Sequence, residues 1–401
     1  MKLYNLRLRE NFQMTIYACF IGYIVQAIIN NFTPLLFLTF QDSYQIPLGQ
    51  ITLLVTINFG LQLLVDLLTI GFVDKIGYRI SMILAHVCAA LGLILLAVLP
   101  KVMPNAFLGL LIAVTVYAVG GGLLEVLVSP VMEACPTDNK EKAMSLLHSF
   151  YCWGHVGVVL LSTLFFKVFG IGNWEILAIV WAIIPLLNVF LFTKVPMASL
   201  IADGEKGLSI GQLAKQKIFW IFLLMMVCAG ASEQAVSQWA STFAEKGLGV
   251  SKAVGDLAGP MAFAILMGGA RAFYGKYGDK INLEKFMVGS SILCVGSYLC
   301  IALIPSPFIG LLACAICGMS VGIMWPGTFS KAAAAIPGGG TAMFAFMALA
   351  GDLGCSGGPT LVGMVSGMFG DDLHKGILAA TIFPLLLIVG IRMQTLLFRK
   401  N

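Results

Sequence analysis

Long apolar runs dominate the sequence and recur about twelve times along its 401 residues. They cover residues 12–38, 48–72, 80–99, 106–134, 143–167, 174–193, 217–243, 253–274, 285–304, 307–334, 341–369 and 375–398. A helix needs about 20 apolar residues to cross a bilayer, and no run alternates with the period of two that barrel strands show. Because only 11% of residues are charged, we predict an all-α integral membrane protein with twelve transmembrane helices. Pro130 and Pro326 are predicted to interrupt the fourth and tenth spans.

The distribution of Lys and Arg residues predicts the orientation of these helices. If the N-terminus is cytoplasmic, 19 of the 24 Lys and Arg residues fall on that side of the membrane. Cytoplasmic loops are enriched in these residues, so both termini are predicted to be cytoplasmic. The basic residues lie in separate turns and form no patch for nucleic acid. The expected partners are the bilayer and a small-molecule substrate, for a monomer that crosses the cell membrane many times.

The two halves of the sequence repeat one another. Residues 195–216 form the longest predicted connection, a cytoplasmic linker between six-helix bundles at 1–194 and 217–401. Three segments recur, at offsets of 201, 200 and 197 residues: Gly71–Arg79 at Ala272–Lys280, Gly122–Glu125 at Gly322–Trp325, and Gly154–Gly157 at Gly351–Gly354. The offsets indicate a duplicated unit with both copies in the same orientation. In transporters, such parallel repeats flank a solute site near the membrane midplane.

Acidic residues inside the apolar runs are the first candidates for function. Glu125 lies within the fourth run, where a carboxylate is costly unless it faces a cavity, finds a partner or takes up a proton. We predict that Glu125 couples proton movement to transport. Asp66 and Asp352 are further candidates for the same role. A structural hydrogen bond between helices is the alternative for all three.

Amide, carboxylate and aromatic side chains within the spans indicate a polar solute. Amides both donate and accept hydrogen bonds, and an aromatic ring can pack against the apolar face of a sugar. Asn58, Gln62 and Asp66 recur every four residues and share one helix face. The predicted substrate-binding residues are Gln26, Asn30, Asn31, Asn58, Gln62, His155, Glu233, Gln234, Gln238, Trp239 and Trp325. Interhelical hydrogen bonding remains the alternative for this set.

The segment Gly71–Arg79, with the sequence GFVDKIGYR, resembles the cytoplasmic loop motif of the major facilitator superfamily. The resemblance implies a tight turn at Gly71 and Gly77, with Asp74 and Arg79 pairing across helices in one access state. Arg271, in the matching part of the second half, is expected to stabilise an access state as well. An ordinary positively charged turn is the alternative.

Three other stretches, Leu147–Gly154, Gly268–Lys280 and Gly351–Pro359, resemble the fucose:proton symporter family. The resemblance implies the twelve-helix major facilitator fold and sugar–cation symport, and it places the family's acid on the fourth helix at Glu125. Fucose permease also carries an acid on its first helix, whereas residues 12–38 here contain no Asp or Glu.

Taken together, these patterns predict a secondary active transporter that moves a hexose-like sugar by proton-coupled symport with alternating access. Drug efflux and sodium-coupled transport are the alternatives. An anion carrier is disfavoured because the mid-span regions contain no Arg or Lys. No phosphate-binding loop is present, and His148, Cys152 and His155 lack a fourth ligand. Neither a cofactor, a metal nor enzyme activity is therefore expected.

Overall fold

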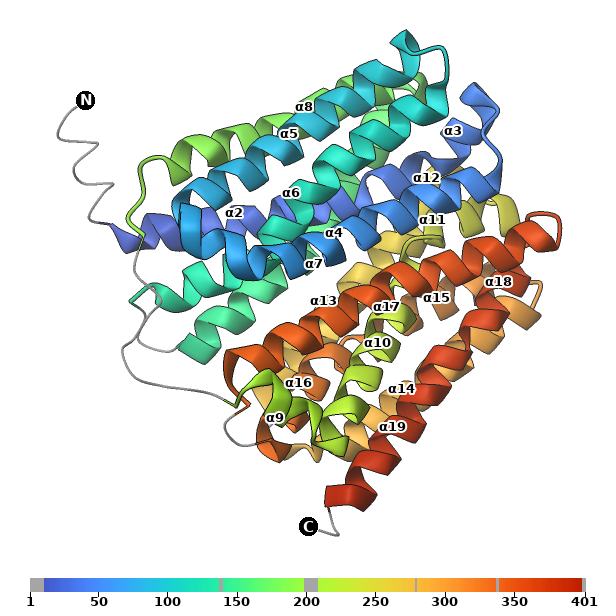
Figure 1. Ribbon diagram of the computed structural model, residues 1–401. Helices are drawn as coiled ribbons and strands as arrows, with labels where there is room; N and C mark the ends of the chain where they lie inside the picture. The colour runs from blue at the N-terminus through green and yellow to red at the C-terminus, as the bar shows by residue number, and fades with distance from the viewer. Residues whose placement is uncertain (1–10, 137–139, 198–207, 278–279, 337–338, 399–401) are drawn as a thin grey trace. The chain divides into compact units, whose positions relative to one another are not determined.

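The computed structural model describes residues 11–136, 140–197, 208–277, 280–336 and 339–398, all of whose regular structure is helical (Figure 1). Within these ranges, 11 segments are long and apolar enough to cross a membrane. Helix α17 (Gly340–Met368), which has 29 residues, occupies the place of the remaining predicted span. The prediction of an all-helical, multi-span membrane protein is confirmed. The cytoplasmic location of the termini stays a prediction.

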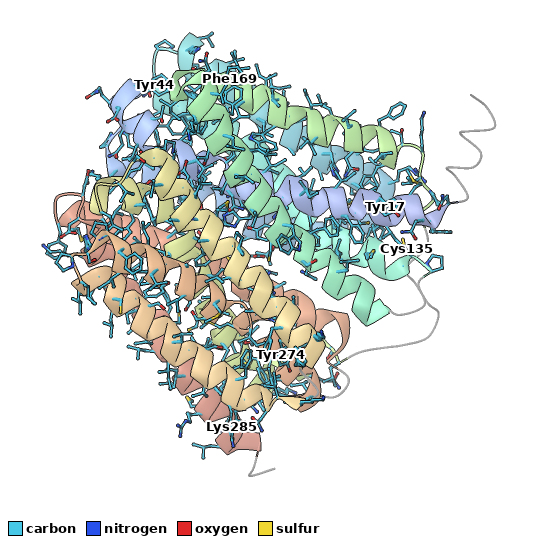
Figure 2. All side chains as sticks on the ribbon, turned by 180° about the vertical axis from the view of Figure 1, so that it is seen from behind. Tyr17, Tyr44, Cys135, Phe169, Tyr274 and Lys285 are labelled. Atoms are coloured by element: carbon cyan, nitrogen blue, oxygen red, sulfur yellow. The ribbon has the colours of Figure 1, made fainter. Side chains whose placement is uncertain are left out.

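The chain divides into two compact units, one made of Met1–Gln50 and Ile57–Asp203, the other of Ile51–Thr56 and Gly204–Asn401. The helices of the first part of the chain are α2 (Phe12–Asn31), η1 (Thr33–Leu36), α3 (Phe37–Tyr44), α4 (Leu48–Ile76), α5 (Tyr78–Val102), α6 (Ala106–Ala134), α7 (Lys140–Phe169), η2 (Ile171–Asn173) and α8 (Trp174–Phe192). Figure 2 shows Tyr44 and Phe169 at one end of this unit and Tyr17 and Cys135 toward the other.

The second part of the chain contains more short segments. Its helices are α9 (Ile210–Ala214), α10 (Lys217–Ser237), α11 (Ala240–Thr242), η3 (Phe243–Gly247), α12 (Lys252–Asp256), η4 (Leu257–Met261), α13 (Ala262–Tyr277), α14 (Leu283–Leu303), α15 (Pro307–Val321), α16 (Met324–Ala335), α17, α18 (Leu373–Ala380) and α19 (Ile382–Phe398). The segments η3 and η4 are single π-helical turns, a geometry that is frequent at functional sites.

The connection between α4 and α5 differs from the predicted tight turn at Gly71. Helix α4 continues through Gly71 and Asp74 to Ile76. Gly77 alone breaks the helix, with a φ of 82° that an L side chain rarely adopts. The side chains of residues 69–75 lie outside the described residues, so the predicted pairing of Asp74 has no structural test.

Glycines bring neighbouring helices into close contact at matching places in the two units. A Cβ atom at Gly122 would lie 2.9 Å from the backbone oxygen of Gln62, so α6 contacts α4 directly. A Cβ atom at Gly322 would lie 2.9 Å from the backbone oxygen of Met267, so the end of α15 contacts α13 in the same way. The two glycines are 200 residues apart. The sequence repeat therefore corresponds to a repeated packing contact.

The prediction that proline interrupts two spans is half correct. Helix α6 runs continuously from Ala106 to Ala134 and includes Pro130. The tenth span consists of two helices, because α15 ends at Val321 and α16 begins at Met324. Proline leaves the carbonyl four residues earlier without its helical N–H partner. At Pro326 that carbonyl belongs to Gly322, which lies in the break.

Candidate functional site

A network of amide side chains joins α2 and α4 in the first unit. Gln62 lies at its centre. The Nε2 atom of Gln62 donates to Asn30 Oδ1 at 2.9 Å and to Asn58 Oδ1 at 3.0 Å. Asn58 Nδ2 also donates to Asn30 Oδ1, at 3.1 Å. Gln26 Nε2 donates to Gln62 Oε1 at 2.9 Å. The four-residue spacing within each helix brings these side chains together, as predicted for α4.

Glu125 of α6 belongs to the same network. Gln26 Nε2 lies 3.2 Å from Glu125 Oε2 and donates to it. Gly121 and Gly122, one turn before Glu125, allow α6 to approach Gln62 of α4. Gln26 is 2% exposed, and its Oε1 atom accepts no hydrogen bond from the described residues. The amide of Gln26 thus donates to the acid Glu125 through Nε2, and its Oε1 atom is a buried acceptor beside that bond.

Three other predicted residues of the first unit occupy separate positions. Asn31 Nδ2 donates to Ala27 O at 2.9 Å and contacts Tyr151 Oη at 3.4 Å. Asp66 lies one turn beyond Gln62 and is buried, as is His155 of α7.

Arg79 bonds backbone carbonyls at the end of α8 in the first unit. Its two terminal nitrogens donate to Phe192 O at 2.7 Å and to Val195 O at 2.8 Å. These carbonyls lie at the end of α8 and just beyond it, where a cation also complements the helix dipole. Arg79 therefore anchors α8 in this structure. Its predicted part in gating remains a prediction.

An ion pair joins α10 and α13 in the second unit. Arg271 Nη2 lies 3.1 Å from Glu233 Oε2. Gln234 Nε2 donates to Glu233 Oε1 at 3.3 Å, and Gln238 Nε2 donates to Gln234 Oε1 at 3.0 Å. Arg271 was expected near the gating loop, but it lies within the candidate span Lys252–Tyr274. The predicted run 253–274 already contains Arg271. Its pairing with Glu233 was not predicted, because spacing along one helix does not report a partner on another.

The helix break in the tenth span contributes to the position of Arg271. Arg271 Nε donates to Gly322 O at 3.3 Å. Pro326, four residues later, has no N–H to offer that carbonyl. The guanidinium therefore bonds a backbone acceptor and a carboxylate at once, which restricts its orientation.

Trp239 is fully enclosed in this structure, whereas Trp325 is half-buried and its predicted contact with substrate stays a prediction. Trp239 is 0% exposed and donates from Nε1 to Pro359 O at 2.9 Å. This structure therefore leaves no face of that ring open. Trp325 lies directly against Gly351, where a Cβ atom would overlap the indole. Asp352, the next residue, is 3% exposed, so Trp325 and Asp352 belong to one packed region of α16 and α17.

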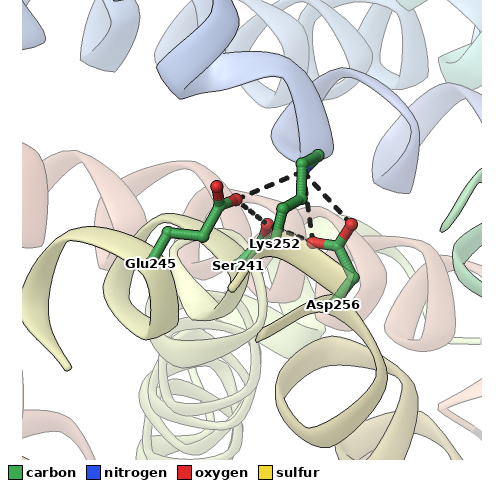
Figure 3. Close-up of polar contacts among 4 residues, drawn as sticks. All are labelled: Ser241, Glu245, Lys252 and Asp256. Carbon is green, nitrogen blue, oxygen red and sulfur yellow. Dashed lines mark hydrogen bonds and ion pairs between the residues drawn. The ribbon is translucent and has the colours of Figure 1, made fainter. Parts of the chain in front are cut away.

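A second charged group in this unit was not predicted (Figure 3). Lys252 Nζ lies 3.2 Å from Glu245 Oε1 and 3.1 Å from Asp256 Oδ2. Ser241 Oγ donates to Asp256 Oδ1. The four residues connect α11, η3 and α12, and Asp256 is 0% exposed. The four-residue spacings of Ser241 with Glu245 and of Lys252 with Asp256 are signals that could have revealed them.

The described residues contain no group of three or more His, Cys, Asp or Glu side chains placed to hold a metal ion. The polar groups of the two networks are therefore amides, the carboxylates of Glu125 and Glu233, and the guanidinium of Arg271. Such groups can bind hydroxyls, charges and protons.

Comparison with known proteins identifies relatives of this fold. The sequence profile of the Major Facilitator Superfamily matches residues 18–359. No curated protein sequence gives a significant match. A variant of the E. coli fucose:proton symporter is similar in structure with a TM-score of 0.67 and 16% identity, over 95% of this chain and 98% of that one.

Two other solved structures have higher TM-scores. The D-xylose-proton symporter has a TM-score of 0.74 at 14% identity, over 96% of this chain and 97% of that one. A bacterial homologue of the human lysosomal transporter Spinster, solved in an inward-facing and occupied conformation, has a TM-score of 0.74 at 14% identity, over 95% and 96% of the two chains. At these identities the likeness shows the fold alone.

Proposed function

Because the chain belongs to the Major Facilitator Superfamily, we propose that it is a symporter that moves a hexose-like sugar together with protons. Membership of this family makes the chain a secondary transporter and not an enzyme. The nature of the solute, the coupling ion and the location in the cell membrane are parts of the proposal, as is alternating access between two six-helix bundles joined by residues 195–216.

The observation that carries the proposal is the amide network that ends on Glu125. Asn30, Asn58 and Gln62 contact one another at 2.9 to 3.1 Å. An amide can donate and accept simultaneously, so such a cluster matches the hydroxyl groups of a sugar, each of which does the same. In this structure the amides bond one another, so a sugar would bind by exchanging its hydroxyl groups for these contacts, which a purely apolar cargo could not replace.

Glu125 supplies the link to protons. An ionised carboxylate only accepts hydrogen bonds, whereas a protonated one also donates. Gln26 bonds both Glu125 and Gln62, so a change in protonation alters the hydrogen bonds available to a solute at the same amides. Such linkage is reciprocal, because a solute that favours the protonated form must also favour proton uptake.

The related structures support the same proposal without establishing it. Two of the three carry a sugar name and the word proton in their descriptions, namely the fucose:proton symporter and the D-xylose-proton symporter. Their identities of 16% and 14% leave the solute of this chain to be measured.

The test is a transport assay in vesicles that contain the purified protein and an internal pH indicator. Candidate hexoses are added outside vesicles that contain the native chain, the Glu125→Gln variant or the Glu284→Gln variant. Glu284 pairs with Lys331 at 3.1 Å, is partly exposed and serves as the control acid. We expect hexose-dependent acidification with the native chain and the control, and none with Glu125→Gln, which should still bind or exchange the sugar.

Two results would change the proposal. Sugar uptake with no pH change in the native chain would exclude proton coupling and would favour sodium coupling, which a sodium gradient in the same vesicles would reveal. No response to any sugar would exclude the hexose and point to another cargo, such as a drug.

A further inference from the structure

The Glu233–Arg271 ion pair is unusual for its surroundings. Both residues lie in candidate membrane spans, Lys217–Gly247 and Lys252–Tyr274. Their charged groups are 3.1 Å apart, with the side chain of Glu233 11% exposed and that of Arg271 20% exposed. The neighbouring residues Ser232 and Gln234 are buried almost completely. The pair is therefore mostly buried, and Arg271 of α13 is its more exposed member.

The exposed part of this pair must face a polar environment. A charged group in contact with lipid tails is expensive, and intramembrane ions usually face a bundle interior or a water-filled path. Arg271 is also tied to Gly322 O and Glu233 to Gln234. Because both charges are held by further hydrogen bonds, the pair keeps its geometry while part of it remains open to a solute.

A paired acid and guanidinium offer a particular kind of recognition. The carboxylate supplies acceptors and the guanidinium supplies a rigid fork of donors, yet their charges cancel. A neutral solute with hydroxyl groups can bond to both without separating them. A solute with its own charge must compete with one member of the pair and leave the other uncompensated, which is unfavourable in a poorly solvated site.

Resting on the proposed function, we propose that Glu233 and Arg271 contact the transported solute and make the protein selective for uncharged molecules. Arg271 is a specificity-determining residue together with Glu233, and the chemical class of the solute is a neutral polyhydroxylated molecule. Removing one charge changes the selectivity in a direction set by the charge that remains.

The test compares a neutral hexose with its acidic and basic counterparts, using glucose, glucuronate and glucosamine. Binding is measured by ligand-induced thermal stabilisation of the purified native chain and the Glu233→Gln, Arg271→Gln and double variants. Glu233→Gln should shift the binding ratio toward glucuronate by ~10-fold, and Arg271→Gln should shift it toward glucosamine by ~10-fold, the effect of one charge-assisted hydrogen bond. The double variant should again favour the neutral sugar.

A matched control separates recognition from structure. Lys252→Gln breaks a different charged group of this unit, in which Lys252 contacts Glu245 and Asp256. This variant should lower thermal stability while the order of preference for the three sugars stays that of the native chain.

Two outcomes overturn the inference. Either both single variants keep the native preference ratios within about twofold, or they shift in the same direction. Recovery of native stability and binding by the double variant, without opposite shifts in the singles, would assign a structural role to the pair. A native chain that binds no sugar contradicts the proposed function instead. In that case the inference holds if Glu233→Gln gains binding of glucuronate and Arg271→Gln gains binding of glucosamine. It fails if neither variant does.

Discussion

Each polar network contains an acid within a candidate membrane span, and the two acids differ in the group that donates a hydrogen bond to them. In the first unit Glu125 receives a hydrogen bond from the neutral amide of Gln26. In the second unit Glu233 receives one from the guanidinium of Arg271. The amide donor is neutral, whereas the guanidinium also places a full positive charge beside the carboxylate. The difference matches the two proposals, proton coupling for the first network and charge selectivity for the second.

Sequence positions support this division. Glu125 corresponds to Trp325 at the repeat offset of 200, and Arg271 corresponds to Ile70 at the offset of 201. Each unit therefore has a charge that its copy lacks. The shared feature is the packing of Gly122 and Gly322 against the neighbouring helix. The duplicated fold is common to both units, and the chemistry has diverged.

The largest expected difference between the networks is in stability. Arg271→Gln leaves the Glu233 carboxylate without its cation and should lower the free energy of unfolding by about 3–5 kcal/mol. Glu125→Gln places an amide among amides and should cost less than about 1 kcal/mol. Thermal or denaturant unfolding of both purified variants measures the contrast. Equal losses would show that the two acids are held alike.

Gln62 tests whether the amides of the first unit form one network. Gln62→Leu removes hydrogen bonds to Gln26, Asn30 and Asn58 and should cost about 2–3 kcal/mol, together with weaker solute binding. Gln13→Leu, on the exposed start of α2, should change stability by less than about 0.5 kcal/mol. Unfolding and binding measurements on both variants decide the point. A Gln62→Leu variant that binds solute as the native chain does would remove the network from the proposed site.

The shared packing contact gives a smaller effect that should be alike in the two units. Gly122→Ala and Gly322→Ala each press a methyl group on a neighbouring backbone oxygen at 2.9 Å and should cost about 1–3 kcal/mol. Gly157→Ala, which meets nothing within 4 Å, should be neutral or stabilising by up to about 1 kcal/mol. Thermal unfolding is the measurement. Markedly unequal costs at Gly122 and Gly322 would argue against an equivalent role.

The smallest effect concerns an ion pair near the protein surface. Glu284→Gln breaks the contact with Lys331, in which the side chain of Glu284 is 36% exposed. Water screens such pairs, so the loss should be below about 1 kcal/mol, measured by the same unfolding assay. A loss as large as that of Arg271→Gln would mean that burial does not distinguish the two pairs.

The sequence allowed the fold to be predicted well because apolar length and repeats are properties of single segments. It also singled out five residues that share one hydrogen-bond network in the structure, namely Gln26, Asn30, Asn58, Gln62 and Glu125. Four-residue spacing on one helix face pointed to Asn58 and Gln62, and an acid inside an apolar run pointed to Glu125, while the roles of all five stay predictions. It did not predict that Arg271 meets Glu233, because these residues come from different helices and only packing decides which faces meet. For the same reason the fully enclosed position of Trp239 could not be foreseen.

Local chain breaks showed the same limit. Both Pro130 and Pro326 were expected to interrupt a span, but α6 continues through Pro130. The tenth span breaks where Gly322 and Ile323 precede Trp325 and Pro326. A proline removes one hydrogen bond in either place. The presence of a proline therefore does not by itself decide whether the helix breaks.

The carbonyl that Pro326 leaves free, Gly322 O, accepts a hydrogen bond from Arg271. A backbone atom is therefore bonded directly to the Glu233–Arg271 ion pair. This acceptor is a backbone oxygen, so it does not depend on which side chains surround it, and it holds the guanidinium at one place on the chain. Gly322 is the C-cap residue of α15, two residues before α16 begins. The guanidinium is therefore bonded to the chain at the break in this span, and its bond to Glu233 starts from the same point.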